Sequence, residues 1–248
     1  MKILKYKKQT SGRYKIFFDN DTDLLLYEDV ILKYELLLKK ELSDKKLEDV
    51  LNYNMECDVY YVALKSLNSR FKSVKELKDS LIKKEYPQEY VDKAILKLLN
   101  QGYLDDRSFS KSYINSQIIT TSKGPNKISK ELKSKGVSDD IINEEILAFS
   151  IEEQKSKIDK VINRLIKSNK TRGGVVLKNK IVTDLINLGY SSSIINDIIS
   201  NYSFDTDSSI REKEYNKLYN RLSRKHSGKE LEYKIREKLF QKGLYYEE

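Results

Sequence analysis

The sequence predicts an all-α protein of tandem three-helix repeats, in an elongated curved array, with a small N-terminal β-hairpin or meander. A helix end of the form Leu-x-x-x-Gly, followed by an apolar residue, recurs about every 50 residues. Apolar residues follow ten and fourteen positions after the first three of these leucines, which indicates a further helix with an i, i+4 stripe. Only 9 Gly and 2 Pro in 248 residues leave few breaks in regular structure. The recurring leucines are Leu81, Leu132, Leu185 and Leu239.

The N-terminal residues have the period of strands. Apolar and polar residues alternate in the short runs Ile3–Tyr6 and Tyr14–Phe18. Two strands are marginally stable alone, so this unit must pack on the next part of the chain or on a partner. From Tyr27 the period becomes helical, and Ser43 is placed to open a second helix. We therefore expect residues 1–56 to form a β-hairpin followed by a helical segment.

Each repeat is expected to hold a leading helix, a middle helix that ends at the recurring motif, and a third helix. Gly136, Gly189 and Gly243 can take the left-handed conformation that ends a helix at little steric cost. Glu85 stands at this place in the first repeat and predicts a strained or differently capped end. The expected divisions are three full repeats, at 57–104, 105–150 and 151–203, and a partial fourth at 204–248.

The starts of the middle helices carry recognisable signals. Ser73-x-x-Glu76 and Ser227-x-x-Glu230 predict capping boxes, and Pro125 stands at a first helical position. The residues ten positions after the first three leucines are expected to be buried, and these are Val91, Ile142 and Ile195.

Composition excludes several classes of protein. No run approaches the ~18 apolar residues of a membrane helix, and the N-terminus has no apolar core of a secretory signal. We therefore expect a cytoplasmic protein without a membrane partner, and a monomer. Cys57 is the single cysteine, so no internal disulfide can form, and we interpret it as a small buried hydrophobic residue.

The chain shows no constellation for catalysis. One His and one Cys cannot supply a Cys/His metal site, and His226 is expected in a loop. Neither Gly-rich nucleotide-binding motif occurs. We therefore predict no enzymatic activity, no catalytic residue, no metal and no cofactor.

Asp105 and Asp106 are the one carboxylate pair that could hold Mg²⁺ for phosphodiester chemistry. They follow a helix stop at Gly102 by three residues and precede the helix of Phe109. Acids at this place satisfy free N–H groups and the helix dipole, so we favour a capping role over a metal site.

A basic stretch is the strongest candidate for a binding surface. Residues 154–181 hold nine Lys or Arg and one acid, Asp159. Four of the bases recur at helical spacing, so they share one helix side, and Gly173-Gly174 would allow close backbone approach to a polyanion. The alternative is an ordinary solvated helix face and loop. The hypothetical phosphate-facing surface comprises Lys157, Lys160, Arg164, Lys167, Lys170 and Arg172, with Arg221, Arg224 and Lys225 from the next repeat.

The stretch Gly102-Tyr103-Leu104-Asp105-Asp106-x-x-Phe109 resembles the signature that joins the first and second repeats of the bacterial RecX family. Residues 63–77, 124–136 and 218–243 resemble three further marked stretches of that family. The resemblance covers roughly residues 57–245, and the N-terminal β segment resembles an extension found in Gram-positive members.

The resemblance implies control of the RecA recombinase by binding. Members of the family bind along the helical groove of the recombinase–DNA filament and alter filament growth, ATP hydrolysis and strand exchange. The implied partners are the RecA filament and single- and double-stranded DNA, in recombination and DNA repair, and we expect inhibition. A stand-alone nucleic-acid-binding helical repeat protein is the alternative from the residues alone. A nuclease that depends on Asp105 and Asp106 is a more distant one.

Overall fold

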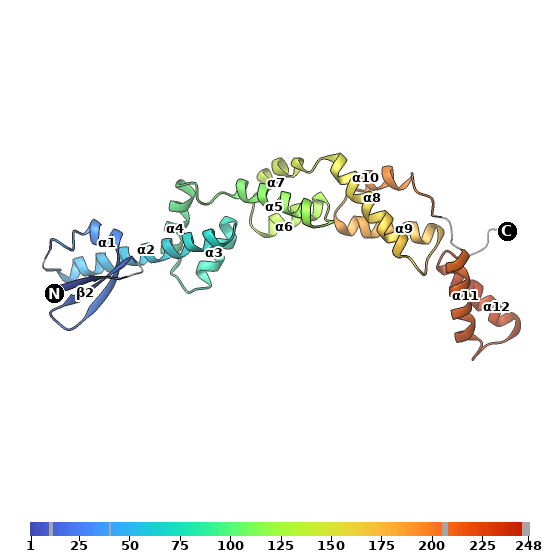
Figure 1. The fold of residues 1–248 in the computed structure, drawn as a ribbon, viewed down its shortest axis with the longest axis horizontal. Coiled ribbons are helices and arrows are strands. Elements are labelled where there is room, and N and C mark those ends of the chain that lie inside the picture. Colours follow the sequence, from blue (N-terminus) through green and yellow to red (C-terminus); the bar gives the residue numbers. More distant parts are fainter. Residues whose placement is uncertain (10–11, 40, 205–207, 245–248) are drawn as a thin grey trace. The chain divides into compact units, whose positions relative to one another are not determined.

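The computed structural model describes residues 1–9, 12–39, 41–204 and 208–244. It is mostly helical, with a small antiparallel sheet at the N-terminus (Figure 1). Two compact units form, one of Met1–Ser110 with Ser134–Ile141 and one of Lys111–Lys133 with Ile142–Glu248. The expected partial repeat at 204–248 includes residues that lie outside the described ones.

The strands are β1 (Ile3–Lys8), β2 (Arg13–Phe18) and β3 (Asp23–Tyr27), followed by α1 (Glu28–Lys33). The helices that make up the repeats are α2 (Asp44–Ser69), α3 (Val74–Ile82), α4 (Gln88–Asn100), α5 (Asp106–Thr120), α6 (Pro125–Ser134), α7 (Asp139–Glu145), α8 (Ile151–Ser168), α9 (Gly174–Leu188), α10 (Ser192–Ile199), α11 (Ser208–Leu222) and α12 (Gly228–Gln241). A short 3₁₀ helix, Ile146–Ala148, follows α7.

The three strands form a meander in the order β1-β2-β3, so the predicted β unit is confirmed. Ile16 on the central strand pairs with Tyr6 on one side and Leu24 on the other. Ile16, Phe18 and Leu26 are fully buried in a core that includes residues of α1 and α2. The sheet therefore packs on the helices that come after it, which buries the hydrophobic face of this small sheet.

The helical prediction after Tyr27 is only partly right. The helix α1 has six residues and is followed by turns, and an isolated bridge pairs Lys2 with Glu41. Leu32 and Leu38 are exposed, whereas Leu36 is buried.

Ser43 opens α2, as predicted, and its side chain accepts a hydrogen bond from the N–H of Lys46. However, α2 is one helix of 26 residues. The leading helix expected within 57–104 is therefore not separate from the helix that Ser43 opens, and the expected division at 56/57 lies inside α2. Val50 and Cys57 belong to the core of the sheet, whereas Val59 belongs to the core of the first repeat. One helix thus contributes to two cores.

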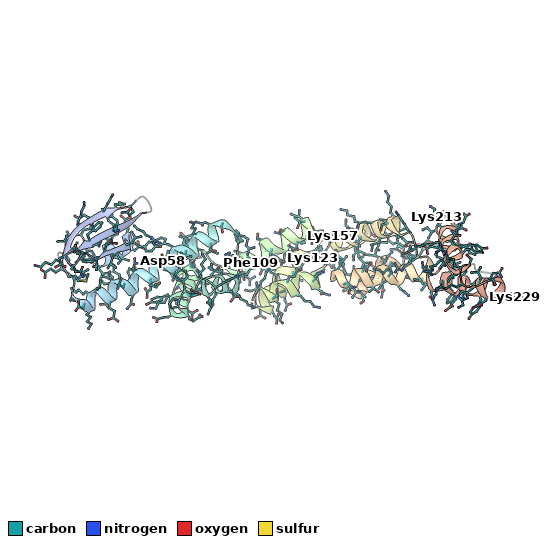
Figure 2. All side chains as sticks on the ribbon, turned by 90° about the horizontal axis from the view of Figure 1, so that it is seen from below. Asp58, Phe109, Lys123, Lys157, Lys213 and Lys229 are labelled. Carbon is teal, nitrogen blue, oxygen red and sulfur yellow. The ribbon has the colours of Figure 1, made fainter. Side chains whose placement is uncertain are left out.

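A polar cluster ties the sheet to the same long helix. Asp58 of α2 (Figure 2) accepts from Arg13 at 2.8 Å, from Tyr27 at 2.6 Å and from Tyr86 at 2.7 Å. Burial alone would raise the pKa of the Asp58 carboxyl, but these three donors lower it.

The three-helix pattern after α2 is confirmed. Val91, Ile142 and Ile195 are all buried, with exposed fractions of 0%, 3% and 0%, so the recurring stripes are core stripes. The helix α6 begins at Pro125, as predicted. The divisions at 104/105, 150/151 and 203/204 fall between helices.

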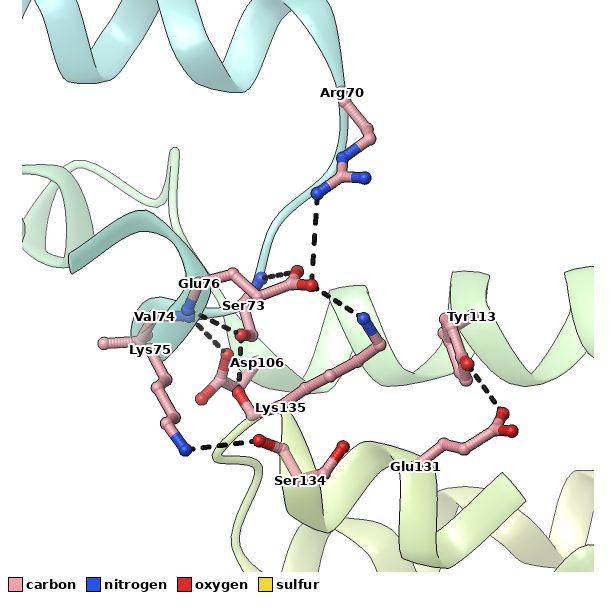
Figure 3. A network of polar contacts seen from close by, with 10 residues as sticks. All are labelled: Arg70, Ser73, Val74, Lys75, Glu76, Asp106, Tyr113, Glu131, Ser134 and Lys135. Atoms are coloured by element: carbon pink, nitrogen blue, oxygen red, sulfur yellow. Dashed lines mark hydrogen bonds and ion pairs between the residues drawn. The ribbon is translucent and has the colours of Figure 1, made fainter. Parts of the chain in front are cut away.

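Only one of the two predicted capping boxes forms. Ser73 accepts from the N–H of Glu76 at 3.1 Å, and the Glu76 carboxylate accepts from the N–H of Ser73 at 3.3 Å (Figure 3). Ser227 stands at the N-cap of α12, but its side chain makes no capping hydrogen bond, so that prediction is wrong. A capping box that was not predicted joins Ser150 and Glu153 at the start of α8.

A close backbone contact, here called a helix-end junction, joins the start of α6 to the end of α9. The N–H of Gly124 donates to the carbonyl of Leu188 at 2.7 Å, and the N–H of Asn126 donates to that of Gly189 at 3.0 Å. Gly189 has φ +96°, and a Cβ added there would lie 2.5 Å from the nitrogen of Lys127. Glycine is therefore required for two reasons, the left-handed backbone and the close approach.

The same backbone junction recurs before α9, and a side-chain hydrogen bond takes its place before α3. The N–H of Gly173, before α9, donates to the carbonyl of Lys242 at 2.9 Å, and a Cβ on Gly243 would collide with Gly173. At the start of α3 the hydroxyl of Ser73 donates to the carbonyl of Lys135 at 2.6 Å (Figure 3). The N-terminus of one middle helix thus meets the C-terminal end of the next, which satisfies N–H and C=O groups that both ends leave free.

Glu85 follows α3 where the other middle helices have glycine, and it takes the left-handed conformation, with φ +64°. The prediction of a strained end is confirmed. The side chain is exposed. Because a Cβ is tolerated only where no neighbouring backbone approaches closely, this position needs no glycine for packing.

Candidate nucleic-acid interface

The basic stretch occupies α8, the loop after it and the start of α9. Ile158, Val161 and Ile162 are buried on one side of α8. Lys160, Arg164 and Lys167 are exposed, and none of the three forms an ion pair with a described residue. The helix therefore separates an apolar inner side from a cationic outer side.

Lys157 differs from its neighbours on α8. Its ammonium group donates to the carbonyl of Thr121 at 2.7 Å and is half-buried (Figure 2). Burial, followed by the nearby charge of Lys160, lowers the pKa of Lys157. Because the Lys157 ammonium group already donates to a backbone carbonyl, it is less available to bind a phosphate.

Lys170 and Arg172 are held by a small turn after α8. The Asn169 side chain accepts from the N–H of Arg172 at 3.2 Å and donates to its carbonyl at 2.6 Å. The two basic side chains are exposed at this turn. Gly173 and Gly174, however, are occupied by the helix-end junction with Gly243, so the expected backbone approach of a polyanion at these glycines is not supported.

Arg221, Arg224 and Lys225 lie at the end of α11 and in the loop before α12, and all three are exposed. The end of α12 that contacts Gly173 is its C-terminal end, whereas these bases precede its N-terminal end. The 14 residues of α12 span about 21 Å. The structure therefore places the nine predicted bases in two groups rather than in one continuous patch.

The two acids of the signature from Gly102 to Phe109 make different contacts, so the expectation that both cap the helix of Phe109 is wrong for Asp106. Asp105 accepts from the N–H groups of Arg107 and Ser108, each at 3.0 Å, and so caps α5. The carboxyl pKa of Asp105 is lowered by the hydrogen bonds from Ser108 and then from the backbone. Asp106 instead accepts from the N–H of Val74 at 2.9 Å, at the start of α3 (Figure 3).

The burial of Asp106 raises its carboxyl pKa, opposed by the bond from Val74. Phe109 and Leu104 are buried in the same segment (Figure 2 marks Phe109), and Gly102 takes φ +72°. Tyr103, by contrast, is 60% exposed.

Sequence reasoning missed a hollow beside this signature. A cavity of about 590 Å³ opens between the end of α2 and the α4–α5 turn, and Phe71, Tyr103 and Leu67 line it. Phe71 and Tyr103 are both more than half exposed. Apolar residues next to a helix end signal such a hollow only weakly, because the same residues are usual in a core.

Cys57 is buried, and burial raises the pKa of its thiol to about 11. His226 lies in the loop before α12, with Nδ1 2.9 Å from the Glu230 carboxylate. Among the described residues no group of three or more His, Cys, Asp or Glu could hold a metal ion. No helix in the described part has the length and hydropathy to cross a membrane.

The fold and this surface define a class: tandem three-helix repeat proteins with an N-terminal sheet and exposed basic helix sides. Comparison with known proteins narrows the class. A family model described as the first three-helix domain of RecX matches residues 60–98, and one described as the second three-helix domain matches residues 105–145. These matches begin in α2 and at Asp105.

The chain belongs to the RecX family. It is 31% identical over 247 residues to the regulatory protein RecX of Bacillus subtilis, covering 98% of this chain and 93% of that protein. It is 33% identical over 196 residues to the regulatory protein RecX of Listeria monocytogenes serotype 4b, covering 78% and 73%.

Solved structures agree with this assignment. A crystal structure of a regulatory protein RecX matches with a TM-score of 0.72 at 26% identity, over 80% of this chain and 98% of that one. The crystal structure of RecX from Lactobacillus salivarius matches with a TM-score of 0.57 at 26% identity, over 60% and 97%.

Proposed function

We propose that this chain regulates a RecA-type recombinase by binding the recombinase–DNA filament, and that it lowers recombinase activity in recombination and DNA repair. Membership in a family of regulatory proteins supports a regulatory role related to RecA. The proposal involves binding alone, with no chemical step.

The observation that carries the proposal is the one-sided cationic surface of α8. Lys160, Arg164 and Lys167 recur at i+4 and i+3, and their side chains are exposed. A recombinase filament presents regularly spaced phosphates together with protein, and exposed Lys and Arg contact phosphates without reading sequence. Tandem repeats supply a long surface for the protein part of the contact.

A stand-alone nucleic-acid-binding protein is the second candidate, because the same exposed bases would serve it. The two functions differ in what the partner must contain. If DNA binding without recombinase persists at ~0.2 M salt, the second candidate is favoured. If binding at that salt requires recombinase, the filament is the partner.

The test is a recombinase ATPase assay on single-stranded DNA with the purified chain added. We expect the chain to lower ATP hydrolysis and a Lys160→Glu/Arg164→Glu/Lys167→Glu variant to lose most of this effect. The slope of log K against log salt should flatten by about 0.7 per lost contact on single strands and about 0.9 on duplex.

A matched control reverses three exposed lysines elsewhere, Lys65→Glu/Lys83→Glu/Lys84→Glu, with the same change in net charge. It should behave as the parent. If the α8 variant keeps the parent's affinity and salt slope on recombinase-coated DNA, the cationic side of α8 is only a solvated face.

A further inference from the structure

The N-terminal sheet has two edges, and much of one is already covered. At the β3 edge the side chain of Asn54, on α2, donates to the carbonyl of Leu25 at 3.3 Å and accepts from the N–H of Tyr27 at 3.0 Å. This side-chain amide takes the place of a neighbouring strand. The start of β1 is covered as well, because Lys2 forms a β-bridge with Glu41.

The rest of β1, residues 4–8, forms the open edge of the sheet. In the part of the chain that the structure describes, this segment pairs with β2 alone. Two large apolar side chains face solvent here, since Leu4 is 67% exposed and Tyr6 is 50% exposed. An edge strand presents unpaired N–H and C=O groups to which another chain can pair. The other residues of the open edge are exposed cations, Lys5, Lys7 and Lys8.

The register of β1 shows which of its backbone groups point away from the sheet. The N–H of Gln9 donates to the carbonyl of Arg13 at 2.7 Å. Bonded and non-bonded pairs alternate along an antiparallel ladder, so Lys5 and Lys7 direct their backbone groups at β2. Tyr6, between them, directs its N–H and C=O outward, and a partner strand can bond to both.

Two of the lysines carry an unpaired charge on the same face of the sheet. The ammonium group of Lys8 lies 3.4 Å from the Glu28 carboxylate, whereas neither Lys5 nor Lys7 forms an ion pair with a described residue. The side chains of Lys5 and Lys7 leave one face because the two residues are two positions apart on a strand, and that of Tyr6 leaves the opposite face. A strand that pairs with β1 therefore meets cations at alternate positions.

Charge decides which strand can pair with the open edge. A second copy of this chain, paired antiparallel around Tyr6, would place Lys5 opposite Lys7 on both sides of the centre. Like charges directly opposite each other destabilise a sheet, so the lysines oppose pairing of the chain with itself. A strand with acids at these two positions makes two cross-strand pairs of opposite charge instead, and an apolar residue between the acids lies opposite Tyr6.

We propose that the open edge of β1 binds an extended acidic segment of a protein partner as a fourth, antiparallel strand. In this segment acidic residues lie opposite Lys5 and Lys7, and an apolar residue lies opposite Tyr6. Main-chain hydrogen bonds supply the affinity of such a complex, and the alternate side chains supply its specificity. The inference goes beyond the proposed function, which depends on the exposed bases of α8.

The test is isothermal titration calorimetry of the full chain with an end-capped peptide of four Glu-Val repeats. A cross-strand pair of opposite charge strengthens pairing about 1.4- to 5-fold. Lys5→Gln/Lys7→Gln removes two such pairs and should weaken binding about 2- to 30-fold. The matched control Lys83→Gln/Lys84→Gln makes the same change in net charge at exposed residues after α3 and should bind as the parent. Circular dichroism melting should show the parent's transition for both variants, because the substituted side chains are exposed.

N-methylated peptides separate strand pairing from attraction between charges. In the antiparallel pair the valine opposite Tyr6 exchanges both backbone bonds with β1, whereas the glutamates direct their N–H groups away from it. A peptide that is N-methylated on its valines should therefore lose binding. A peptide of the same charge that is N-methylated on its glutamates should still bind.

The proposal is overturned if the Glu-Val peptide does not bind, if both methylated peptides bind equally, or if Lys5→Gln/Lys7→Gln keeps the parent's affinity. Two other occupants would also overturn it. A dimer of the parent that Tyr6→Pro dissociates would identify a second copy as the partner, since proline on an edge removes only an outward N–H. A thymidine oligonucleotide that binds through Lys5 and Lys7 while no peptide does would assign the lysines to phosphates.

Discussion

Replacing Gly189 by alanine tests whether the helix-end junctions hold the repeats together. Alanine at φ +96° has an unfavourable left-handed backbone, and its Cβ would lie 2.5 Å from the nitrogen and 2.6 Å from the Cβ of Lys127. Gly228→Ala is the matched control. Gly228 has φ +57° in the same unit, and an added Cβ there meets nothing within 4 Å.

Both substitutions lower the free energy of unfolding through an unfavourable backbone conformation, and only one of them also lowers it through a steric clash. The left-handed conformation costs an alanine about 1–2 kcal/mol, partly offset because alanine restricts the unfolded chain. Only Gly189→Ala also overpacks a backbone contact, which costs about 1–3 kcal/mol. The difference between the variants should therefore be about 1–3 kcal/mol.

Urea unfolding followed by circular dichroism gives the free energies of unfolding. Because tandem repeats can unfold in stages, amide hydrogen exchange supplies a local measurement. The N–H groups of Gly124 and Asn126, which donate across this junction, should exchange faster in Gly189→Ala and at the parent's rate in Gly228→Ala. Equal losses of stability in the two variants would refute the reasoning.

Two further predictions concern the unit of Met1–Ser110 with Ser134–Ile141. Glu85→Gly should raise the free energy of unfolding by about 0.5–1 kcal/mol in urea titrations, because it relieves the left-handed backbone at φ +64°; no change would contradict the strain. Burial alone would raise the pKa of the Glu76 carboxyl, but the hydrogen bonds from Lys135 and from the N–H of Ser73 lower it. The charged carboxylate therefore stabilises the folded protein fully above about pH 4.3, the value in the unfolded chain. This stabilisation is lost as the pH falls through the lower pKa of the folded state. Glu76→Gln should therefore be less stable than the parent at pH 7, with the difference shrinking in unfolding titrations below pH 4; a constant difference would contradict this.

The repeats were predictable because their signals are local. The leucine motif, the stripe that contains Val91 and the start at Pro125 each involve residues within a few turns of one another. The continuity of α2 was not predictable in this way. Val50 and Val59 enter different cores, so the buried side rotates along the helix and no single stripe appears.

The candidate site was likewise predictable only where its signals are local in the sequence. The cationic side of α8 follows from helical spacing alone. The bond from Val74 to Asp106 and the contact of Gly173 with Lys242 join residues 32 and about 70 positions apart, and nothing in the local sequence indicates them. These contacts decide which polar groups and glycines remain available to a ligand.

The helix-end junctions also bear on how such arrays grow during evolution. Ser227 and Gly228 have backbone angles close to those of Gly173 and Gly174, with φ −141° at both first residues and +57° and +51° at the second. A duplicated unit ending in Lys-Gly could join there without altering the existing backbone. Glu85 stands after α3 at the position where such a join needs glycine. A duplicated unit could therefore join next to α12 but not next to α3.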